Sequence, residues 1–435
     1  MEDATMGQED VRKELRLALD KTSGGALFPE SLEKHIVDLV KIHAPTVDLL
    51  TVRQADSAVQ EYVRTTSIPL GRFEGELASQ ALQSSANERV QLPLKIIRRG
   101  GSVAGFTDAA SRKFVDAYER EIVLATRGIA ATIECGDMFG NADADQYQYT
   151  GFDPQIKNRF DADAVAALDI LDAMIDEVHT AGGTRHDKVF FMSPKMLSKF
   201  SRLDETIRRT IAKTEYAGGI RMASYRGANI IEAPYLKPTI KMSAVTAADG
   251  GVAGTLSAGD DYRYRVAAVT LTGGESYASD VTTHTAPAAP NSSIKLTWAA
   301  VDGAILYKIY RDNGGGEALT LLTTIAALTY DANGTPTGTV TEWTDTGAIA
   351  YDANADRPLD KSDGDEIIFL IDLDPDEAAC LYGLRSTTGE KLNNLVVFEE
   401  LAKTKDSRDF MLKAYLALAV KNEYLHAVTR RVRLA

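Results

Sequence analysis

The sequence predicts an α+β host domain that is interrupted by an all-β module. Residues 243–346 contain only five Lys or Arg residues, and both tryptophans of the chain, Trp298 and Trp343, lie within them. The sequence on either side is rich in Lys, Arg and Glu, and its apolar residues recur with helical periodicity. Short apolar segments alternate with these helical patterns, which is typical of mixed α and β layers. We therefore expect the host, rather than the module, to carry the function.

The length and charge of the chain limit the possible functions. The 435 residues are enough for about two to three domains. The formal net charge is −14, with acidic residues spread along the chain, so tight DNA binding by the whole protein is not expected. Basic clusters at 98–99, 208–209 and 430–433 are interpreted as solvated or ion-paired surface. The alternative is that they make local contacts to a neighbouring subunit or to nucleic acid.

The cysteines and the N-terminus indicate a reducing cytoplasm. Cys135 and Cys380 are the only cysteines, and they form neither a disulfide framework nor a CxxC motif. The first 20 residues lack the apolar core of a secretory signal, and no run of about 18 apolar residues predicts a membrane span.

Two helices and a protruding arm are expected first. Residues 10–20 read as a short charged helix, and a second helix is expected from Ser31 to a stop at Pro45. Residues 51–99 contain two extended segments on either side of a polar, glycine-containing middle. Because neither strand alone buries much surface, they predict a β-arm that protrudes from the host.

A long helix is the strongest prediction of the host. From Asp108 the apolar positions step by three or four residues along one face and end before Gly140-Asn141. They are Phe114, Tyr118, Ile122, Ala125, Ile129 and Ile133. Another helix is expected after Asp161, up to Gly182-Gly183. Its predicted apolar face consists of Val165, Leu168, Leu171, Ile175 and Val178.

Buried strands and capped helices follow in alternation. Residues 188–192 read as a buried strand, and Ser193-Pro194 caps a helix through Phe200. A strand is expected after Gly227 and another at 365–373, followed by a turn at 374–377. Near the C-terminus, 411–420 fits either a long strand or a helix.

The module reads as two hairpins. Tyr262, Tyr264, Val266 and Ala268 alternate inward before a turn at 273–274. In the second hairpin Ile294, Leu296 and Trp298 precede a turn at 301–303, and Ile305, Tyr307 and Ile309 follow it. Both hairpins resemble fibronectin type III modules, with the last hairpin of that family placed first. The resemblance implies one circularly permuted sandwich, and two partial modules are the alternative.

Several patterns that look like sites do not have the chemistry. Asn141, Asp143 and Asp145 begin like a calcium loop, but position six is Gln146 and position twelve is Phe152. His179 and His186 have no third metal ligand at suitable spacing, and 314–316 is a hairpin turn rather than a phosphate loop. No serine or cysteine stands in a nucleophile motif. The sequence therefore predicts a structural protein that is not an enzyme, with no catalytic, cofactor-binding or metal-binding residues and no cofactor.

The order of elements in the host resembles the major capsid proteins of tailed bacteriophages, which have the Johnson or Hong Kong 97-type fold. The segment 51–99 looks like the E-loop of that family, and 108–138 looks like its spine helix, ending in CGDMFGN. The helices and strands of 169–236 resemble its axial domain. The segment YLALAVKNEYLHAVTRRV, with Leu425-His426-Ala427, resembles its final strand and favours a strand at 411–420.

The resemblance divides the chain into seven segments. They are an N-terminal arm (1–50), an E-loop (51–99), a peripheral domain with the spine helix (100–154), a first axial segment (155–240), the inserted fibronectin III or immunoglobulin-like β-sandwich (241–347), a second axial segment (348–392) and C-terminal strands of the peripheral domain (393–435).

This resemblance implies a shell protein. Homo-hexamers and homo-pentamers would form an icosahedral virion capsid around double-stranded DNA, assembled in the bacterial cytoplasm without a membrane. Portal, separate scaffolding and decoration proteins would be the partners. The sandwich would project outward as a removable knob that serves either weak adhesion to a host-surface glycan or protein or the stability of the capsid. Lys95 is the only lysine of the arm segment, so crosslinking through the arm is not expected.

Three alternatives are considered. An encapsulin-like compartment has the same fold and holds cargo enzymes. A tail or baseplate adhesin would act through the sandwich, and a secreted carbohydrate-active enzyme would use it as a linker. The absence of a signal peptide and of a paired-carboxylate motif disfavours the enzyme.

Overall fold

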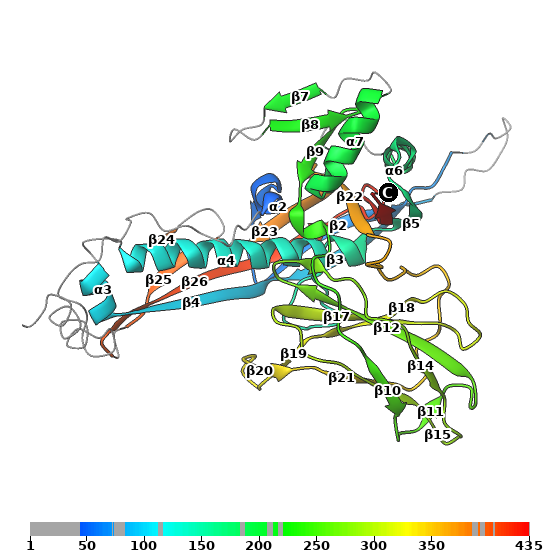
Figure 1. The fold of residues 1–435 in the computed structure, drawn as a ribbon. Helices are drawn as coiled ribbons and strands as arrows, with labels where there is room; N and C mark the ends of the chain where they lie inside the picture. The colour runs from blue at the N-terminus through cyan, green and yellow to red at the C-terminus, as the bar shows by residue number, and fades with distance from the viewer. Residues whose placement is uncertain are drawn as a thin grey trace, which may run out of the picture.

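The computed structural model describes residues 44–71, 73, 83–111, 116–182, 188–206, 212–215, 221–384, 390–391, 396–402 and 405–434. Two mixed layers of the host meet near the C-terminal end of a long helix, and an all-β module lies against that meeting point (Figure 1). The helices expected at 10–20 and from Ser31, together with Phe114, His186 and Arg208-Arg209, lie outside the described residues.

One layer of the host is a seven-stranded sheet covered by two helices. In spatial order its strands are β5 (Asn158–Val165), β27 (Ala427–Arg433), β22 (Glu366–Asp372), β6 (Lys188–Met192), β9 (Ala228–Glu232), β8 (Arg221–Tyr225) and β7 (Ala212–Glu215). Every residue of β6 and β22 is buried, as expected for central strands. The helices are α6 (Leu168–Thr180) and α7 (Pro194–Thr206), and Ser193 Oγ caps α7 by accepting from the Met196 amide at 3.1 Å.

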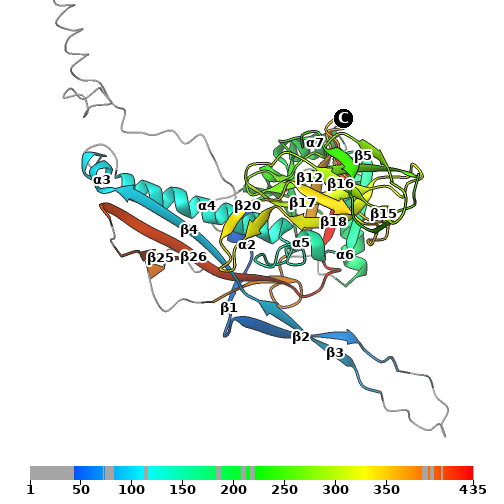
Figure 2. The ribbon, with the colours of Figure 1, turned by 90° about the horizontal axis from the view of Figure 1, so that it is seen from below.

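The other layer is an elongated limb. Its sheet contains β1 (Val52–Gln54), β23 (Ala379–Gly383), β26 (Ser407–Val420), β25 (Val397–Glu400) and β24 (Glu390–Lys391), with β4 (Lys95–Ala104) on β26. The long helix α4 (Ala117–Phe139) runs along this sheet (Figure 2). The short helices are α2 (Pro45–Leu49), α3 (Gly105–Ser111), α5 (Phe152–Gln155) and the 3-10 turn η1 (Pro234–Leu236).

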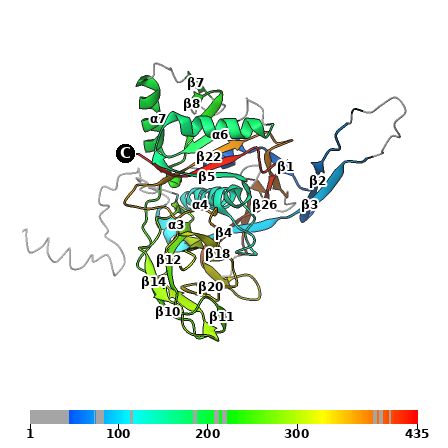
Figure 3. The same ribbon diagram turned by 90° about the vertical axis from the view of Figure 1, so that its right-hand side faces the viewer.

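The arm is a hairpin of β2 (Val59–Ser67) and β3 (Ala86–Pro93), which extends away from the limb (Figures 2 and 3). The two flanking strands predicted within 51–99 are therefore confirmed. The ends of that segment belong instead to β1 and β4 in the sheet of the limb, so only its middle protrudes.

The module contains strands and no helix between residues 246 and 345, all of which the structure describes. One sheet holds β10 (Thr246–Asp249), β16 (Ile294–Thr297) and β21 (Glu342–Asp345). The other holds β13 (Gly274–Glu275), β12 (Asp261–Thr270), β17 (Ala304–Arg311) and β18 (Thr320–Ala326), with β14 (Thr282–Thr285) on β12. Two short pairs complete it, β11 (Gly254–Thr255) with β15 (Asn291–Ser292) and β19 (Leu328–Tyr330) with β20 (Pro336–Thr339). Side chains of both larger sheets meet in one apolar core.

The expected alternation of buried and exposed residues in β12 is correct for one face of the strand but not for the other. Tyr264 and Val266 face the core of the module as predicted, but Ala267 and Val269, at positions of the opposite face of the strand, are also fully buried. Val269 belongs to the apolar cluster of the host, because the second face of this sheet packs against the host. The second hairpin is similar, since Tyr307 and Ile309 face the module while Ile305 packs against the cluster of the host.

Three predicted helix boundaries are wrong. The long helix begins at Ala117 rather than near Asp108, because Asp116 accepts hydrogen bonds from the Tyr118 and Glu119 amides at 3.0 Å and caps it. Pro45 begins α2 instead of ending a helix, since proline is well tolerated at the first helical position. Asp161 and Val165 lie in β5, which pairs in parallel with β27, so α6 starts only at Leu168.

The C-terminal region forms two strands in different sheets. Residues 411–420 lie in β26, so the prediction of a strand is correct. The segment expected to be one final strand is divided after Val420, and β27 pairs with β22 and β5 in the seven-stranded sheet. Conversely, β23 comes from the segment expected as axial but pairs with β26 in the limb.

Candidate assembly surface and its anchorage

Four of the five most exposed large apolar side chains among the described residues lie on the arm, and the fifth is Phe106 of α3. Val63, Ile68 and Leu70 are 65%, 73% and 85% exposed, and Phe73 is fully exposed. An isolated hairpin is at best marginally stable in water, and exposed apolar patches of this kind mark surfaces that another molecule covers. The arm is therefore the clearest candidate for a contact surface.

The base of the arm is fixed to the limb. The Tyr62 hydroxyl donates to the Val420 carbonyl at 3.2 Å, and Arg64 forms ion pairs with Glu423 at 3.2 Å and with Glu88 at 2.9 Å. Lys95, at the foot of the arm, donates to the Gln146 carbonyl at 2.5 Å. The polar contacts thus hold the base, while the apolar side chains lie toward the tip.

A buried network of charges joins the module to the host. Lys308 of β17 contacts Asp153 of α5 and Glu275 of β13, both at 2.7 Å. Arg430 of β27 also contacts Glu275, and its guanidinium lies 3.7 Å from Asp356. Arg159 completes the set with ion pairs to Asp153 at 2.9 Å and to Asp356. Three cations therefore balance three carboxylates at the interface.

The cations of this network keep its carboxyl groups ionised. Burial alone would raise the pKa of Asp153, but Lys308, Arg159 and Arg430 hold it below the ordinary value. Burial likewise opposes the charge of Glu275, and Arg430 and Lys308 keep its pKa low. Since removal of one partner from a buried pair costs about 3–5 kcal/mol, the network makes the module and the host depend on each other.

Apolar and aromatic contacts extend this interface. Val269, Tyr277 and Leu306 of the module belong to the same apolar cluster as Phe139 and Phe369 of the host. These contacts place the module directly beneath the C-terminal end of α4, as Figures 1 and 3 both show.

The loop that resembles a calcium site forms part of the interface. The Asn141 side chain accepts from the Asp143 amide at 2.9 Å, and Asp145 accepts from the Tyr147 amide at 3.0 Å. The Tyr330 hydroxyl of the module donates to Asp145 at 2.7 Å, and its ring lies 4.5 Å from that of Tyr147. These oxygens therefore cap turns and receive the module.

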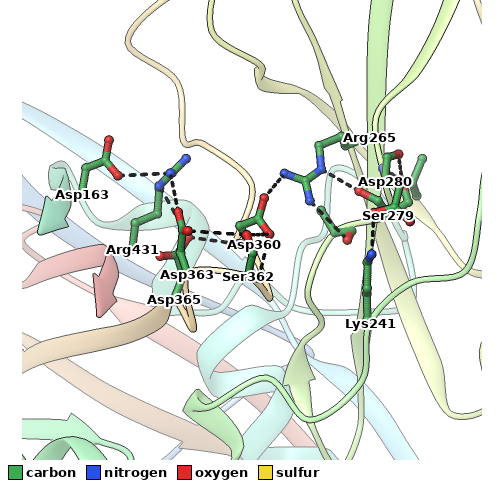
Figure 4. A network of polar contacts seen from close by, with 12 residues as sticks. Asp163, Lys241, Arg265, Ser279, Asp280, Asp360, Ser362, Asp363, Asp365 and Arg431 are labelled. Atoms are coloured by element: carbon green, nitrogen blue, oxygen red, sulfur yellow. Dashed lines mark hydrogen bonds and ion pairs between the residues drawn. The ribbon is translucent and has the colours of Figure 1, made fainter. Parts of the chain in front are cut away.

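The segments that lead into and out of the module are tied together by a second polar cluster (Figure 4). Arg265 of β12 contacts Asp360 at 2.9 Å and donates to the Ser279 carbonyl at 2.6 Å, while Lys241 pairs with Asp280 at 2.5 Å. A hollow of about 400 Å³ lies among these side chains. Because both signs of charge line it in near balance, it favours neither a cation nor an anion.

The remaining predicted or discounted positions have structural roles. His179 lies in the last turn of α6, and Gly314 lies in the turn after β17. The Cys135 thiol is buried against the Thr270 carbonyl, and burial raises its pKa to about 12. His426, which the sequence only placed near the C-terminus, accepts from the Asp372 amide at 3.2 Å, and burial lowers its pKa to about 4. No group of three potential metal ligands occurs among the described residues.

Sequence reasoning missed the charge network. Its signal was present in Lys308, which interrupts the apolar segment 304–310, and in Glu275, which follows a glycine turn. Both residues carry charge in strands that are otherwise buried.

No described helix is both long and apolar enough to cross a membrane.

The fold is similar to that of solved capsid structures. No protein-family model and no curated protein matches the sequence. A chain of the cyanophage A-1(L) capsid has 11% identity and a TM-score of 0.50, with 95% of this chain and 99% of that chain covered. An encapsulin from Synechococcus elongatus has 8% identity, a TM-score of 0.48 and 94% coverage of both chains. The capsid protein of a native GTA particle has 10% identity, a TM-score of 0.47 and coverages of 94% and 97%. The chain has a mixed α/β structure with the Hong Kong 97-like fold of phage capsid proteins.

Proposed function

We propose that this chain is the major capsid protein of a tailed double-stranded DNA phage. Hexamers and pentamers of it would build an icosahedral head that encloses the genome. The observation that carries the proposal is the arm, whose apolar side chains are exposed although its base is firmly held. The shared fold with the cyanophage capsid chain supports it.

A second copy of the chain is the occupant that fits the arm. Ile68, Leu70 and Phe73 are almost completely exposed, and covering each would contribute about 1.5–3 kcal/mol. Three such side chains provide about 5–9 kcal/mol per arm before the entropy of association is considered. In a closed shell every subunit donates one arm and receives another, so this contribution repeats at each contact.

We propose that the module is a permuted sandwich of the immunoglobulin or fibronectin III type on the outer surface of the shell. Two features support this: β16 and β17 follow each other in sequence but lie in different sheets, and β12 lies between β14 and β17. The sheet β10–β16–β21 is the one farther from the host cluster, and we propose that it faces a host-surface glycan or protein. Portal, scaffolding and decoration proteins would be the further partners of the shell.

Replacement of the apolar residues on the arm tests the proposal. The triple variant Ile68→Ser, Leu70→Ser, Phe73→Ser should remain folded but form no shells by sedimentation and electron microscopy. The matched control replaces Val252, Val281 and Ile349, which are 48%, 50% and 40% exposed outside the arm, and should assemble like the wild type. Normal shells from the arm variant would refute the role of the arm.

The contents of native particles distinguish a phage head from a protein compartment. Double-stranded DNA protected from nuclease is the expected content. An enclosed enzyme in place of DNA would instead indicate an encapsulin-like compartment, and fibres or spikes without shells would indicate an adhesin.

A further inference from the structure

The last turns of α4 bury two carboxyl groups side by side. Glu134 is 3% exposed and Asp137 is fully buried, and their spacing of three residues places them on the same face of the helix. They lie at the end of α4 where α2 and η1 approach it. Through η1 the chain continues into the module, so this point joins three parts of the fold.

Hydroxyl and amide groups, rather than cations, contact the pair. The Thr46 amide of α2 donates to Glu134 Oε2 at 2.8 Å, and the Tyr235 hydroxyl of η1 donates to Glu134 Oε1. The Tyr149 hydroxyl lies 2.7 Å from Asp137 Oδ1. Thr46 Oγ1 contacts both acids, Glu134 Oε2 closely and Asp137 Oδ2 at 3.4 Å.

A proton shared by the two acids would supply a hydrogen bond that the hydroxyl of Thr46 cannot make on its own. A threonine hydroxyl has a single hydrogen, so Thr46 can donate to Glu134 or to Asp137, but not to both. Thr46 can accept a hydrogen bond from the acid to which it does not donate only when that acid, Glu134 or Asp137, is protonated. The geometry therefore fits a pair of acids that retains a proton.

The surrounding charges do not compensate the pair. Among the described residues no Lys, Arg or His contacts either carboxyl group. Cys135, Tyr149 and Tyr235 are the titratable neighbours, and burial raises the pKa of each, so they are neutral. Asp48 of α2 is exposed, while Asp153 of α5 and Glu275 of β13 are paired with Lys308.

We propose that Glu134 and Asp137 form a proton-sharing clasp that holds α2 and η1 on the end of α4 and loosens when the pair loses its shared proton. Two like charges in a buried site without a cation repel each other and lack solvation, so loss of the shared proton favours opening of the site to water, although Thr46 and Tyr235 donate more strongly to a charged carboxylate. Because α2 is the first helix of the described chain, the clasp determines how firmly the start of the described fold is held.

The titration of Glu134 determines the direction of the pH effect and the pH interval in which it occurs. Burial raises its pKa to about 7, against the hydrogen bonds from Thr46 and Tyr235, and burial also raises the pKa of Asp137. The closed clasp therefore binds more protons than the open one. Its stability is fully present below the ordinary carboxyl pKa of about 4.3 and decreases as the pH rises toward about 7. Opening should increase by up to about tenfold per pH unit in this interval.

Hydrogen exchange of the full-length chain tests the clasp. Protection factors of the α2 amides, corrected for intrinsic rates, should fall at least about tenfold between pH 5.5 and 7.5 in the wild type. Glu134→Gln imitates the protonated acid and should keep the protection of pH 5.5 at both values. Glu119→Gln, an exposed position near the start of the same helix, is the matched control and should behave like the wild type.

An infrared measurement on the wild type keeps the test independent of how the variants fold. A carbonyl band of a protonated carboxyl group should be present at pH 6 and weaken as the pH rises, and Asp137→Asn should alter it. Equal protection of α2 at pH 5.5 and 7.5, a parallel loss in Glu134→Gln, or no protonated carboxyl band at pH 6 would overturn the proposal.

Discussion

Replacement of Lys308 by methionine tests the dependence of the module on the host. Methionine keeps most of the length of the side chain but removes the ammonium that lies 2.7 Å from both Asp153 and Glu275. The two carboxylates would then remain buried with fewer counter-charges, since the Lys308 side chain is only 6% exposed. A broken pair of this kind costs about 3–5 kcal/mol.

The expected shift in melting temperature follows from the size of the chain. An unfolding entropy of about 2.1 cal/mol/K per residue gives about 0.9 kcal/mol per degree for 435 residues. The loss in Lys308→Met therefore corresponds to about 3–6 °C, if the module and the host unfold together. Differential scanning calorimetry of unassembled subunits at pH 7 measures it, and the fall should affect a single shared transition.

Lys295→Met is the matched control. Lys295 lies in the same module and pairs with Glu342 at 2.6 Å, but the two side chains are 38% and 59% exposed. Exposed pairs contribute about 0–1 kcal/mol, so this variant should melt within about 1 °C of the wild type. Equal melting temperatures for the two variants, or a shift confined to a separate module transition, would refute the coupling.

Three further predictions follow from the same contacts. Deletion of 243–346 with a short glycine linker should yield an insoluble host domain. Asp153 and Arg430 then lose their partners in the module, and the apolar cluster around Phe139 is exposed to water. A soluble deletion protein with a circular dichroism spectrum like that of the wild type would instead support a removable knob. The charge network should stabilise the fold above the ordinary carboxyl pKa of about 4, and this stability should be lost as the pH falls below that value. The reason is that the pKa values of Asp153 and Glu275 are lowered in the fold. Urea midpoints at pH 3–5 should therefore fall more steeply in the wild type than in Lys308→Met. Asp116→Ala should lower the free energy of unfolding by about 1 kcal/mol because it removes the cap of α4, whereas Asp116→Asn should keep most of that free energy. Equal urea midpoints for the alanine variant and the wild type would count against the cap.

The sequence contained enough information for the individual elements of the host. The three-to-four spacing from Tyr118 to Ile133 predicted the face of α4, and the Ser193-Pro194 pair predicted the start of α7. Both features depend on residues that are close together in the sequence, so tertiary packing did not alter them. The start of α4 was predicted too early because Phe114 continues the apolar spacing, while the cap is formed by Asp116, whose role depends on backbone geometry.

Long-range pairings could not be read from the sequence. Nothing in the residues around Ala427 indicates that β27 leaves the sheet of β26 and pairs with β22 and β5. The burial of Val269 also depends on the host that covers the second face of the sheet. The expectation that the module could be removed arose from its resemblance to a permuted sandwich inserted in a loop of the host, and the contacts of Lys308 and Tyr330 with the host argue against it.

Electron cryomicroscopy of the purified full-length chain at high concentration tests the central claim most directly. We expect closed shells of uniform diameter in which the β2–β3 arm lies on an adjacent subunit and buries Leu70 and Phe73. A monodisperse monomer, or shells in which the arm remains uncovered, would contradict it.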